Sequence, residues 1–459
     1  MRLLLDAVTQ TAEKTSLRVG MISLGCPKNL VDAEIMLGQL REEAAVELTH
    51  ELDEADVVIV NTCGFIDAAK QESIDTILEV AERKKSSPTR LVVTGCMVQK
   101  YRTELAESIP EIDAFVGLDH LEKITSAVTG ADVCDAAPVR RKMSVRLYED
   151  LPRVLTQGVS HGYLKVSEGC SNPCTFCAIP QMRGKFRSRS IDSLVREAQQ
   201  LERQGVMELC LVAQDTTRYG EDLGVANGLT SLIERLLGET DFRWIRFLYA
   251  YPGSIDWSLF ELMGREPRFV SYCDIPLQHV SERVLRTMRR PGSPEEYRKM
   301  IGRMRDLVPD ISLRTTFITG HPGETPSDFG QLHDFVAWAE FDQMGAFCYS
   351  PEDHTPAGRM TDIPSRRTAE RRRAKLMELQ QQISFARNQA KVGTTLDAII
   401  TGVCSETEHL LEGRLIGQAP EIDGRLLVND GIERIASMPA FARVEITDAH
   451  PYDLVGGVV

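Results

Sequence analysis

The stretch from residue 168 to residue 180, EGCSNPCTFCAIP, decides which fold and chemistry to expect of this chain. It places Cys170, Cys174 and Cys177 within eight positions, spaced C-x3-C-x2-C, with no fourth cysteine nearby. Thiolates are the standard ligands of iron–sulfur clusters, and a 4Fe-4S cube takes four ligands. Three thiolates from one loop leave one iron open to an outside ligand. The alternative is a zinc site completed by a distant His or Cys, although zinc motifs more often contain two C-x2-C pairs.

The bulk composition is that of ordinary globular domains, about three of them for this length. The net charge of −14 does not favour wholesale binding to nucleic acid. No stretch approaches the roughly 18 apolar residues of a membrane span, and the first 16 residues lack the apolar core of a signal peptide. We therefore expect a cytoplasmic protein without a membrane partner, in which clustered thiols are metal ligands or catalytic groups rather than disulfides.

Upstream of the trio, apolar runs alternate with helical patterns. Residues 18–26, 56–65 and 90–98 are rich in Val, Ile and Leu, as buried strands are, and a helical pattern follows each of them. This alternation predicts a parallel α/β sheet, which we assign to a first domain at 16–142. One cysteine falls at the carboxyl end of each strand, the edge where open α/β sheets bind ligands. These cysteines are Cys26, Cys63 and Cys96.

A second alternating series follows a predicted linker at 143–158. Six apolar runs, beginning with residues 162–170, predict six βα units in a domain at 156–388. Six units are too few for a full eight-stranded barrel, so we expect a partial, TIM-like (β/α) barrel. Such barrels carry their chemistry where the strands end. The C-x3-C-x2-C loop directly follows the first of these strands and therefore lies at that face.

The last part of the chain has a different pattern. A long polar helix with a basic start, SRRTAERRRAK at 365–375, precedes short apolar runs separated by turn residues. These runs predict a small antiparallel β-barrel at 389–459. From residue 391 onward there are five Lys or Arg and eleven Asp or Glu, a net charge of −6. An acidic module repels phosphates and suits a basic protein partner.

The C-x3-C-x2-C loop after the first strand of a (β/α) barrel, with Phe176 before its last cysteine, resembles the radical S-adenosylmethionine (SAM) superfamily. The resemblance implies that Cys170, Cys174 and Cys177 are catalytic and hold a 4Fe-4S cluster. SAM would chelate the open iron and be cleaved by one electron to a 5′-deoxyadenosyl radical. The fourth ligand is then absent from the chain because SAM supplies it.

The resemblance extends over nearly the whole chain. An N-terminal domain with three separated cysteines, a radical SAM barrel and a small C-terminal β-barrel together resemble the methylthiotransferases. This implies that Cys26, Cys63 and Cys96 hold a second 4Fe-4S cluster, which delivers sulfur, and that the C-terminal barrel is a TRAM domain. It also implies SAM in two roles, as methyl donor and as radical source, and an electron donor such as flavodoxin or ferredoxin.

Two branches of that family compete, and they differ in substrate. One modifies the β-carbon of an aspartate in the small-subunit ribosomal protein S-twelve, and the other modifies isopentenyl-adenosine beside the tRNA anticodon. Four stretches resemble the ribosomal-protein branch more closely, so tRNA is the alternative and not the expected partner. A non-catalytic zinc scaffold is a third hypothesis. The four stretches are GCPKN at 25–29, GVSHGYLKVSEGC at 158–170, AQDTTRYG at 213–220 and YAYPGSI at 249–255.

Other residues are candidates for contacts to SAM or to the substrate. Gly320 and Glu324, in TGHPGE, resemble the SAM-contacting stretch of the family, and Phe176 and Gln214 are further candidates. Arg183 or Arg189 would pair with a carboxylate, either that of SAM or that of the target aspartate.

Three further features stay open or are assigned a structural role. His279 fits a base, a SAM contact or a structural histidine, and no catalytic role is assigned to His321. The basic run around Arg372 could touch RNA, but a solvated helix face is the preferred interpretation. The five remaining cysteines are expected to be structural: Cys134, Cys210, Cys273, Cys348 and Cys404.

Overall fold

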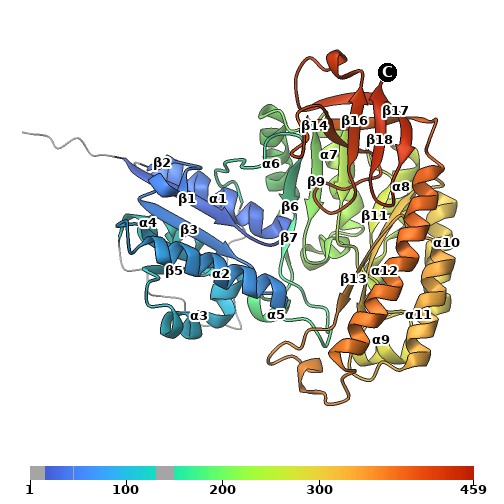
Figure 1. Ribbon diagram of the computed structural model, residues 1–459, viewed down its shortest axis with the longest axis horizontal. Helices are drawn as coiled ribbons and strands as arrows, with labels where there is room; N and C mark the ends of the chain where they lie inside the picture. Colours follow the sequence, from blue (N-terminus) through green and yellow to red (C-terminus); the bar gives the residue numbers. More distant parts are fainter. Residues whose placement is uncertain (1–15, 45, 131–148) are drawn as a thin grey trace, which may run out of the picture.

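The computed structural model describes residues 16–44, 46–130 and 149–459, arranged as three modules (Figure 1). An α/β domain, blue in the figure, lies on one side of a central strand-and-helix domain, and a small red β-barrel lies at one end of that central domain. Cys134, residues 131–142 of the predicted first domain and the first part of the predicted linker lie outside the described residues. Among the described residues, no helix is long and apolar enough to cross a membrane.

The N-terminal sheet is wholly parallel, with strand order β2-β1-β3-β4-β5. The three predicted strands are present, while β2 and β5, each three residues long, were not predicted. Helices cover both faces of the sheet, as the alternating pattern predicts. The elements are β1 Leu17–Ser23, α1 Pro27–Glu43, β2 Val46–Leu48, β3 Val57–Thr62, α2 Asp67–Arg83, β4 Arg90–Gly95, α3 Cys96–Ser108, β5 Ala114–Val116 and α4 Ile124–Thr129.

The central domain is an open half-barrel of six parallel strands. Three strands form the ladder β6-β9-β10 and three form β11-β12-β13, and the Val270 amide joins the two by donating to the Ile245 carbonyl (2.9 Å). No ladder of the described residues joins β6 to β13, which confirms the predicted partial barrel. The strands are β6 Gly162–Lys165, β9 Glu208–Val212, β10 Trp244–Phe247, β11 Tyr272–Asp274, β12 Ser312–Thr319 and β13 Gln343–Cys348.

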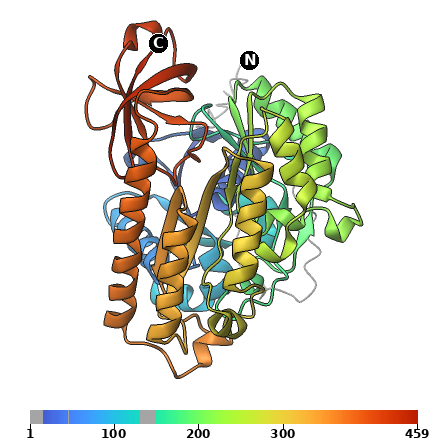
Figure 2. The same ribbon diagram turned by 90° about the vertical axis from the view of Figure 1, so that its right-hand side faces the viewer.

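Amphipathic helices cover the outer face of the half-barrel, and Figure 2 shows the yellow and orange ones side by side. In α6 the Ser190 hydroxyl caps the first turn, and Leu194, Ala198 and Leu201 form the buried stripe, as the sequence predicts. The outer helices are α6 Ile191–Arg203, α7 Gly228–Glu239, α8 Trp257–Arg265, α9 Glu282–Met288, α10 Pro294–Leu307 and α11 Pro326–Ala339. A short hairpin, β7 Ser167–Glu168 with β8 Arg187–Ser188, encloses α5 Ile179–Met182.

The long helix α12 Arg366–Gln389 leads into the C-terminal barrel. The barrel is closed, in the order β14-β15-β16-β18-β17. It is antiparallel, as predicted, except at β16–β18, which run parallel. The strands are β14 Thr395–Val403, β15 Leu411–Leu415, β16 Leu426–Asp430, β17 Ala440–Ala449 and β18 Leu454–Val458.

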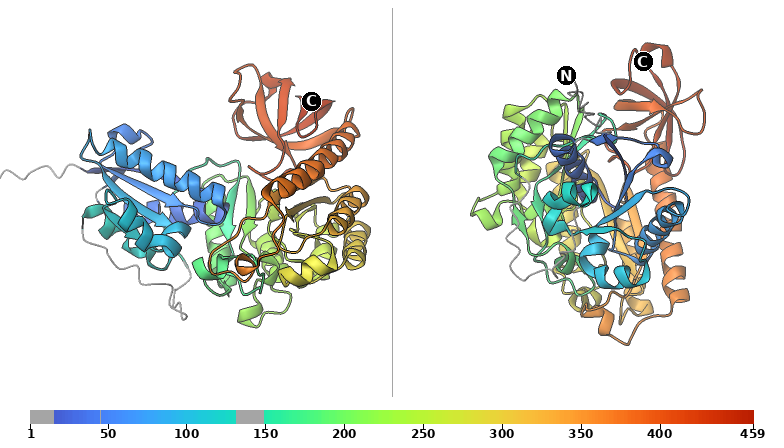
Figure 3. Two further views of the ribbon diagram at one scale, coloured as in Figure 1. Left: turned by 60° about the horizontal axis from the view of Figure 1, so that its bottom comes forward. Right: turned by 90° about the vertical axis from the view of Figure 1, so that its left-hand side faces the viewer.

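Helix α1 packs on two sheets at once. Its residues Ala33, Met36 and Leu40 face its own sheet, whereas Val31 and Ile35 join the cluster that lines the inner face of the half-barrel. The C-terminal barrel reaches the same inner cluster from the other end, where Phe441 stacks edge-on against Trp244 (5.2 Å between ring centroids). Both neighbouring domains therefore pack against the inner face of the half-barrel, and Figure 3 shows them beside it.

Gly38 should be required for the packing of α1 against the segment that leads into the central domain, at Pro152. A Cβ atom at Gly38 would clash with the backbone carbonyl of Pro152, which cannot move like a flexible side chain. We expect Gly38→Ala to destabilise the protein by about 1–3 kcal/mol, as overpacking does. Gly302, in α10, has nothing within 4 Å of its Cβ position, so Gly302→Ala should stabilise by about 0.5–1 kcal/mol. Thermal unfolding of both variants tests this, and equal midpoints would contradict it.

Candidate active site between two cysteine trios

The N-terminal trio lies at the carboxyl ends of three neighbouring strands. Cys26 caps α1 after β1, Cys63 follows β3, and Cys96 begins α3 directly after β4. Gly25 has a φ of +91°, and a Cβ there would lie 2.7 Å from Cys63 Cβ and 2.9 Å from its Sγ. Only glycine tolerates both constraints, so the loop carrying Cys26 touches Cys63.

The second and third loops of this trio also touch. A Cβ atom added to Gly64 would lie 3.0 Å from the Cα of Met97 and 3.3 Å from the carbonyl carbon of Cys96. The three loops therefore form one contact group at a single sheet edge.

The second trio is held in a loop closed by backbone hydrogen bonds. The Cys170 amide donates to the Gly184 carbonyl (3.1 Å), and the Cys177 amide donates to the Cys174 carbonyl (3.3 Å). Two donors point at sulfur: the Asn172 amide at Cys170 Sγ (3.5 Å) and the Arg290 guanidinium at Cys174 Sγ (3.6 Å). Donors directed at sulfur stabilise thiolates, the form that binds metal.

Burial and nearby cations set the thiol pKa values in opposite directions. Burial raises the pKa of Cys96 and that of Cys177 to about 12, and it also raises the pKa of Cys63 and that of Cys170. Burial also acts to raise the pKa of Cys26, but Lys28 and Arg183 bring it below its ordinary value.

Buried thiols of this kind fit a metal cluster, because a bound cation displaces the thiol proton. In the described residues no three His, Cys, Asp or Glu side chains are already arranged around a common metal position. The case for a cluster at each trio therefore rests on two observations. The loops that carry the thiols are held close together, and the thiols are buried.

Arg183 lies between the two trios. Its side chain is buried, with Nη1 3.0 Å from Asp32 Oδ2 and 3.1 Å from Glu168 Oε1. Its charge also acts on the thiols of Cys26, Cys63 and Cys96. The sequence predicted a carboxylate partner for Arg183, and in the structure its partners are these two carboxylates of the chain itself.

In space, only the short segment that follows Cys177 lies between the two trios. Helix α5 begins two residues after Cys177 and ends at Met182. Cys96 packs against Ala178 and Met182 of this segment, so the N-terminal trio touches the chain that leaves the second trio.

Further buried ion pairs close the junction around the trios. Lys165, at the end of β6, pairs with Asp32 of α1 and with Glu168. On the opposite side, Glu352 follows β13 and accepts from Lys70 of α2 (2.7 Å) and Lys100 of α3 (3.0 Å). The cysteine edge of the N-terminal sheet therefore faces the carboxyl ends of the central strands. We call this contact region the inter-trio junction.

The predicted SAM contacts occupy different positions at this end of the half-barrel. Phe176 begins an aromatic row in which its ring centroid lies 6.2 Å from that of His321, and His321 lies 5.3 Å from Tyr349. Gln214 donates to Glu168 Oε1 (3.2 Å), which places it beside the Arg183 network.

Glu324 binds the chain itself. It accepts from the Gly320 amide, lies 3.1 Å from Arg372 of α12 and 3.8 Å from His279 Nε2. The role of Gly320 and Glu324 in binding SAM stays a prediction. Arg372 is buried, so the interpretation of the basic run as a solvated helix face is wrong for this residue, because Glu324 pairs with it. The other five basic residues of the run are exposed: Arg366, Arg367, Arg371, Arg373 and Lys375.

Two residues of the site were not predicted from the sequence. Asp32 and Lys165 are both buried and pair with each other across domains, although 133 positions separate them. The local signal for Asp32 was its position, with Glu34, among the apolar residues of α1. Of the cysteines expected to be structural, Cys210, Cys273 and Cys404 are buried.

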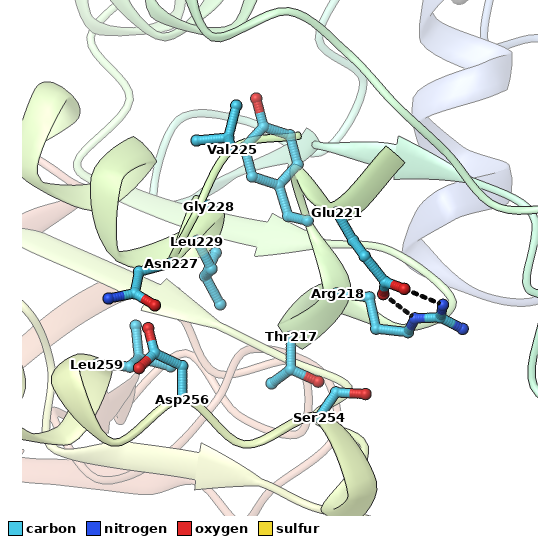
Figure 4. A pocket seen from close by; sticks show the side chains of 11 residues that line it. Thr217, Arg218, Glu221, Val225, Asn227, Gly228, Leu229, Ser254, Asp256 and Leu259 are labelled. Atoms are coloured by element: carbon cyan, nitrogen blue, oxygen red, sulfur yellow. Dashed lines mark hydrogen bonds and ion pairs between the residues drawn. The ribbon is translucent and has the colours of Figure 1, made fainter. Parts of the chain in front are cut away.

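A cavity of about 230 Å³ lies beside the junction, after β9 and β10 (Figure 4). Asp256, Ser254 and the Arg218–Glu221 ion pair are among its lining residues, and no cysteine lines it. Arg218 also donates to Asn172 of the cysteine loop (3.3 Å), so the cavity adjoins the second trio without containing it.

Comparison with known proteins agrees with this architecture. Residues 18–117 match the family described as "Uncharacterized protein family UPF0004", residues 164–336 match the radical SAM superfamily, and residues 392–459 match the TRAM domain. The radical SAM methyltransferase TsrM from Kitasatospora setae has a similar fold, with a TM-score of 0.56 at 15% identity over 75% of this chain and 77% of TsrM.

The fold and the C-x3-C-x2-C loop place the chain among the radical SAM enzymes, which use SAM and an iron–sulfur cluster. Its relatives are more specific. The ribosomal protein uS12 methylthiotransferase RimO of Trichlorobacter lovleyi is 46% identical over 96% of this chain and 98% of the relative. The RimO proteins of Solibacter usitatus and Geobacter sulfurreducens are 45% and 43% identical, each over 96% of this chain and over 94% and 98% of the relative. The chain belongs to the RimO family of radical SAM methylthiotransferases.

His321 should contribute a pH dependence of stability. Burial lowers its pKa to about 4, whereas an unfolded histidine binds its proton near pH 6.5. Its contribution is therefore complete above pH 6.5 and is lost as the pH falls toward 4. Between pH 7 and pH 5.5 the wild type should lose about 1 kcal/mol more free energy of unfolding than His321→Phe. Urea unfolding measures this. His333 is exposed, so His333→Gln should lose as much as the wild type, and equal losses in all three proteins would contradict the prediction.

Proposed function

We propose that this protein adds a methylthio group to the β-carbon of an aspartate in ribosomal protein uS12, using two 4Fe-4S clusters and SAM. The observation that supports this proposal best is the inter-trio junction, where two cysteine trios lie on either side of one short segment. The names of the curated relatives supply the substrate. We further propose that the protein acts in the cytoplasm and takes electrons from a carrier such as flavodoxin or ferredoxin.

In this proposal Cys170, Cys174 and Cys177 hold the cluster that binds SAM, and Cys26, Cys63 and Cys96 hold the second cluster. The first cluster and SAM, when bound, supply a radical that removes a hydrogen atom from the substrate carbon. The residues of the chain bind and orient SAM and the substrate, and they exclude water. Phe176 and Gln214 border the SAM position, and the ion pairs of Arg183 and Glu352 hold the two domains closed around it.

The charge of the C-terminal barrel supports a basic protein substrate. Seven of its acidic residues are exposed, against two exposed basic residues, Arg434 and Arg443. The barrel contacts the amino ends of the central strands, where Arg414 pairs with Glu208 at the start of β9. It would therefore hold a basic segment of the substrate at a distance from the reacting aspartate.

One observation supports the alternative, a tRNA methylthiotransferase acting on isopentenyl-adenosine. The five exposed basic residues at the start of α12 lie near the carboxyl end of β12, because Ala369 packs against Gly320. Such a patch would bind RNA phosphates. It stays the second candidate because the whole chain aligns with RimO proteins.

Cluster content tests the two trios. Protein rebuilt anaerobically should contain about eight iron atoms per chain, the total of two 4Fe-4S cubes. Replacing all three cysteines of either trio with alanine should leave about four. Loss of the Cys170 trio should also abolish SAM cleavage, whereas loss of the Cys26 trio should abolish methylthio transfer. As a matched control, alanine replacement of Cys210, Cys273 and Cys404 should leave the iron content at about eight. One trio holding zinc, or no loss of iron in one variant, would contradict the proposal.

Substrate identity needs a competition assay. The rebuilt enzyme receives SAM, a low-potential reductant and sulfide, together with a uS12 peptide carrying the target aspartate and unmodified tRNA. Mass spectrometry should detect the methylthio gain on the peptide alone. A gain on the tRNA alone would establish the alternative and leave the two-cluster assignment standing.

A further inference from the structure

Lys28 places a positive charge inside the inter-trio junction. It lies in the first turn of α1, two residues after Cys26, and only 7% of its surface is exposed. Its Nζ lies 3.3 Å from the ring centroid of Tyr249, which follows β10 of the half-barrel. The ammonium therefore lies between the N-terminal trio and the carboxyl ends of the central strands.

Resting on the proposed function, we infer that Lys28 binds the side-chain carboxylate of the substrate aspartate and so positions the β-carbon for reaction. Apart from lowering the pKa of the Cys26 thiol, Lys28 has no part in the proposed cluster and SAM sites. Lys28 is then a substrate-binding residue, and the site distinguishes substrates by the charge of the reacting side chain.

The other buried cations of the junction already have carboxylate partners. Lys165 and Arg183 pair with Asp32 and Glu168, and Lys100 pairs with Glu352. Lys28 forms no ion pair with a carboxylate among the described residues; its interactions are with the Tyr249 side chain and with the thiol of Cys26. Burial disfavours the ammonium, and the Cys26 thiol and the Tyr249 side chain offset that cost, but no carboxylate among the described residues neutralises the charge.

The position also opposes helix stability. The first turn of α1 has no acidic residue, and a positive charge there is repelled by the positive end of the helix dipole. Lys28 and the amino end of α1 together make a positive site, which a carboxylate would neutralise. A neutral residue would cost the fold less at this place.

Tyr249 provides a rigid platform for the ammonium. Its backbone has a φ of +66°, a strained value for a residue with a side chain. Two hydrogen bonds maintain this conformation: the Tyr249 amide donates to Asp274 Oδ2 (3.1 Å), and the Tyr249 carbonyl accepts from the Thr216 amide (3.1 Å). Backbone strain held in place at the end of a barrel strand is typical of a site built to position a ligand.

A carboxylate contact at this point would also orient the reacting atom. In aspartate the β-carbon is bonded directly to the carboxyl carbon, so fixing the carboxylate leaves the β-carbon little freedom. Holding the reacting carbon in one place is a large part of how enzymes lower barriers. A substrate with asparagine in place of the aspartate has the same shape without the charge, and it is the natural probe.

The test uses the full chain with both clusters rebuilt and two uS12 peptides, one with the target aspartate and one with asparagine in its place. The aspartate peptide gives KM and kcat, and the asparagine peptide gives an inhibition constant. The wild type should bind the aspartate peptide at least about tenfold more tightly than the asparagine peptide, as a charge-assisted contact requires. In Lys28→Met this difference should disappear through a rise in KM, with iron content unchanged. Lys28→Arg should keep part of it.

Lys185 offers a matched control, because it is an exposed lysine whose backbone lies next to the cysteine loop. Lys185→Met should behave as the wild type does. If Lys28→Met keeps the preference for aspartate, or if its only defect is lost iron or a shifted cluster potential, Lys28 serves the second cluster and the inference is wrong. If Lys28→Met does not fold, Lys28→Arg decides: loss of the preference in that folded variant would overturn the inference. Failure of the wild type to modify the aspartate peptide would instead overturn the proposed function.

Discussion

The structure depends on a buried group of charges at the inter-trio junction. Arg183 and Lys165 share the carboxylates of Asp32 and Glu168, and all four side chains are withdrawn from water. Although burial acts to raise the pKa of Glu168, the two cations hold it well below its ordinary value. Removing any one partner would leave an uncompensated charge in the interior, a strongly destabilising change. The group therefore fixes how the N-terminal domain docks, and with it how one cysteine trio faces the other.

Helix α1 connects this buried group of charges to the packing of both sheets. One element carries Cys26 and Lys28 at its start, Asp32 further along, and apolar residues that pack against the inner face of the half-barrel. Because one side of α1 packs on its own sheet and the other on the half-barrel, the two sheets cannot move independently of it. The carboxyl ends of both parallel sheets are thus brought together. This is the arrangement that the proposed two-cluster reaction requires.

The distribution of charge divides the molecule into two ends. The acidic C-terminal barrel lies at the amino ends of the central strands, away from the cysteines, while the basic start of α12 lies near the catalytic end. A substrate that contacts both must be extended, with basic segments apart from its reacting loop.

The sequence alone determined the three modules, the open half-barrel and the positions of both trios at strand ends, because strand and helix periods and cysteine spacing are local properties. It missed β2 and β5, which are three residues long and stable only as members of a larger sheet. Only the tertiary structure decided that Arg372 is buried in an ion pair with Glu324, that Arg183 pairs with carboxylates of the chain, and that Lys28 lies over the Tyr249 ring. Each of these contacts joins residues far apart in the chain, and no local pattern encodes which distant charge a side chain will meet.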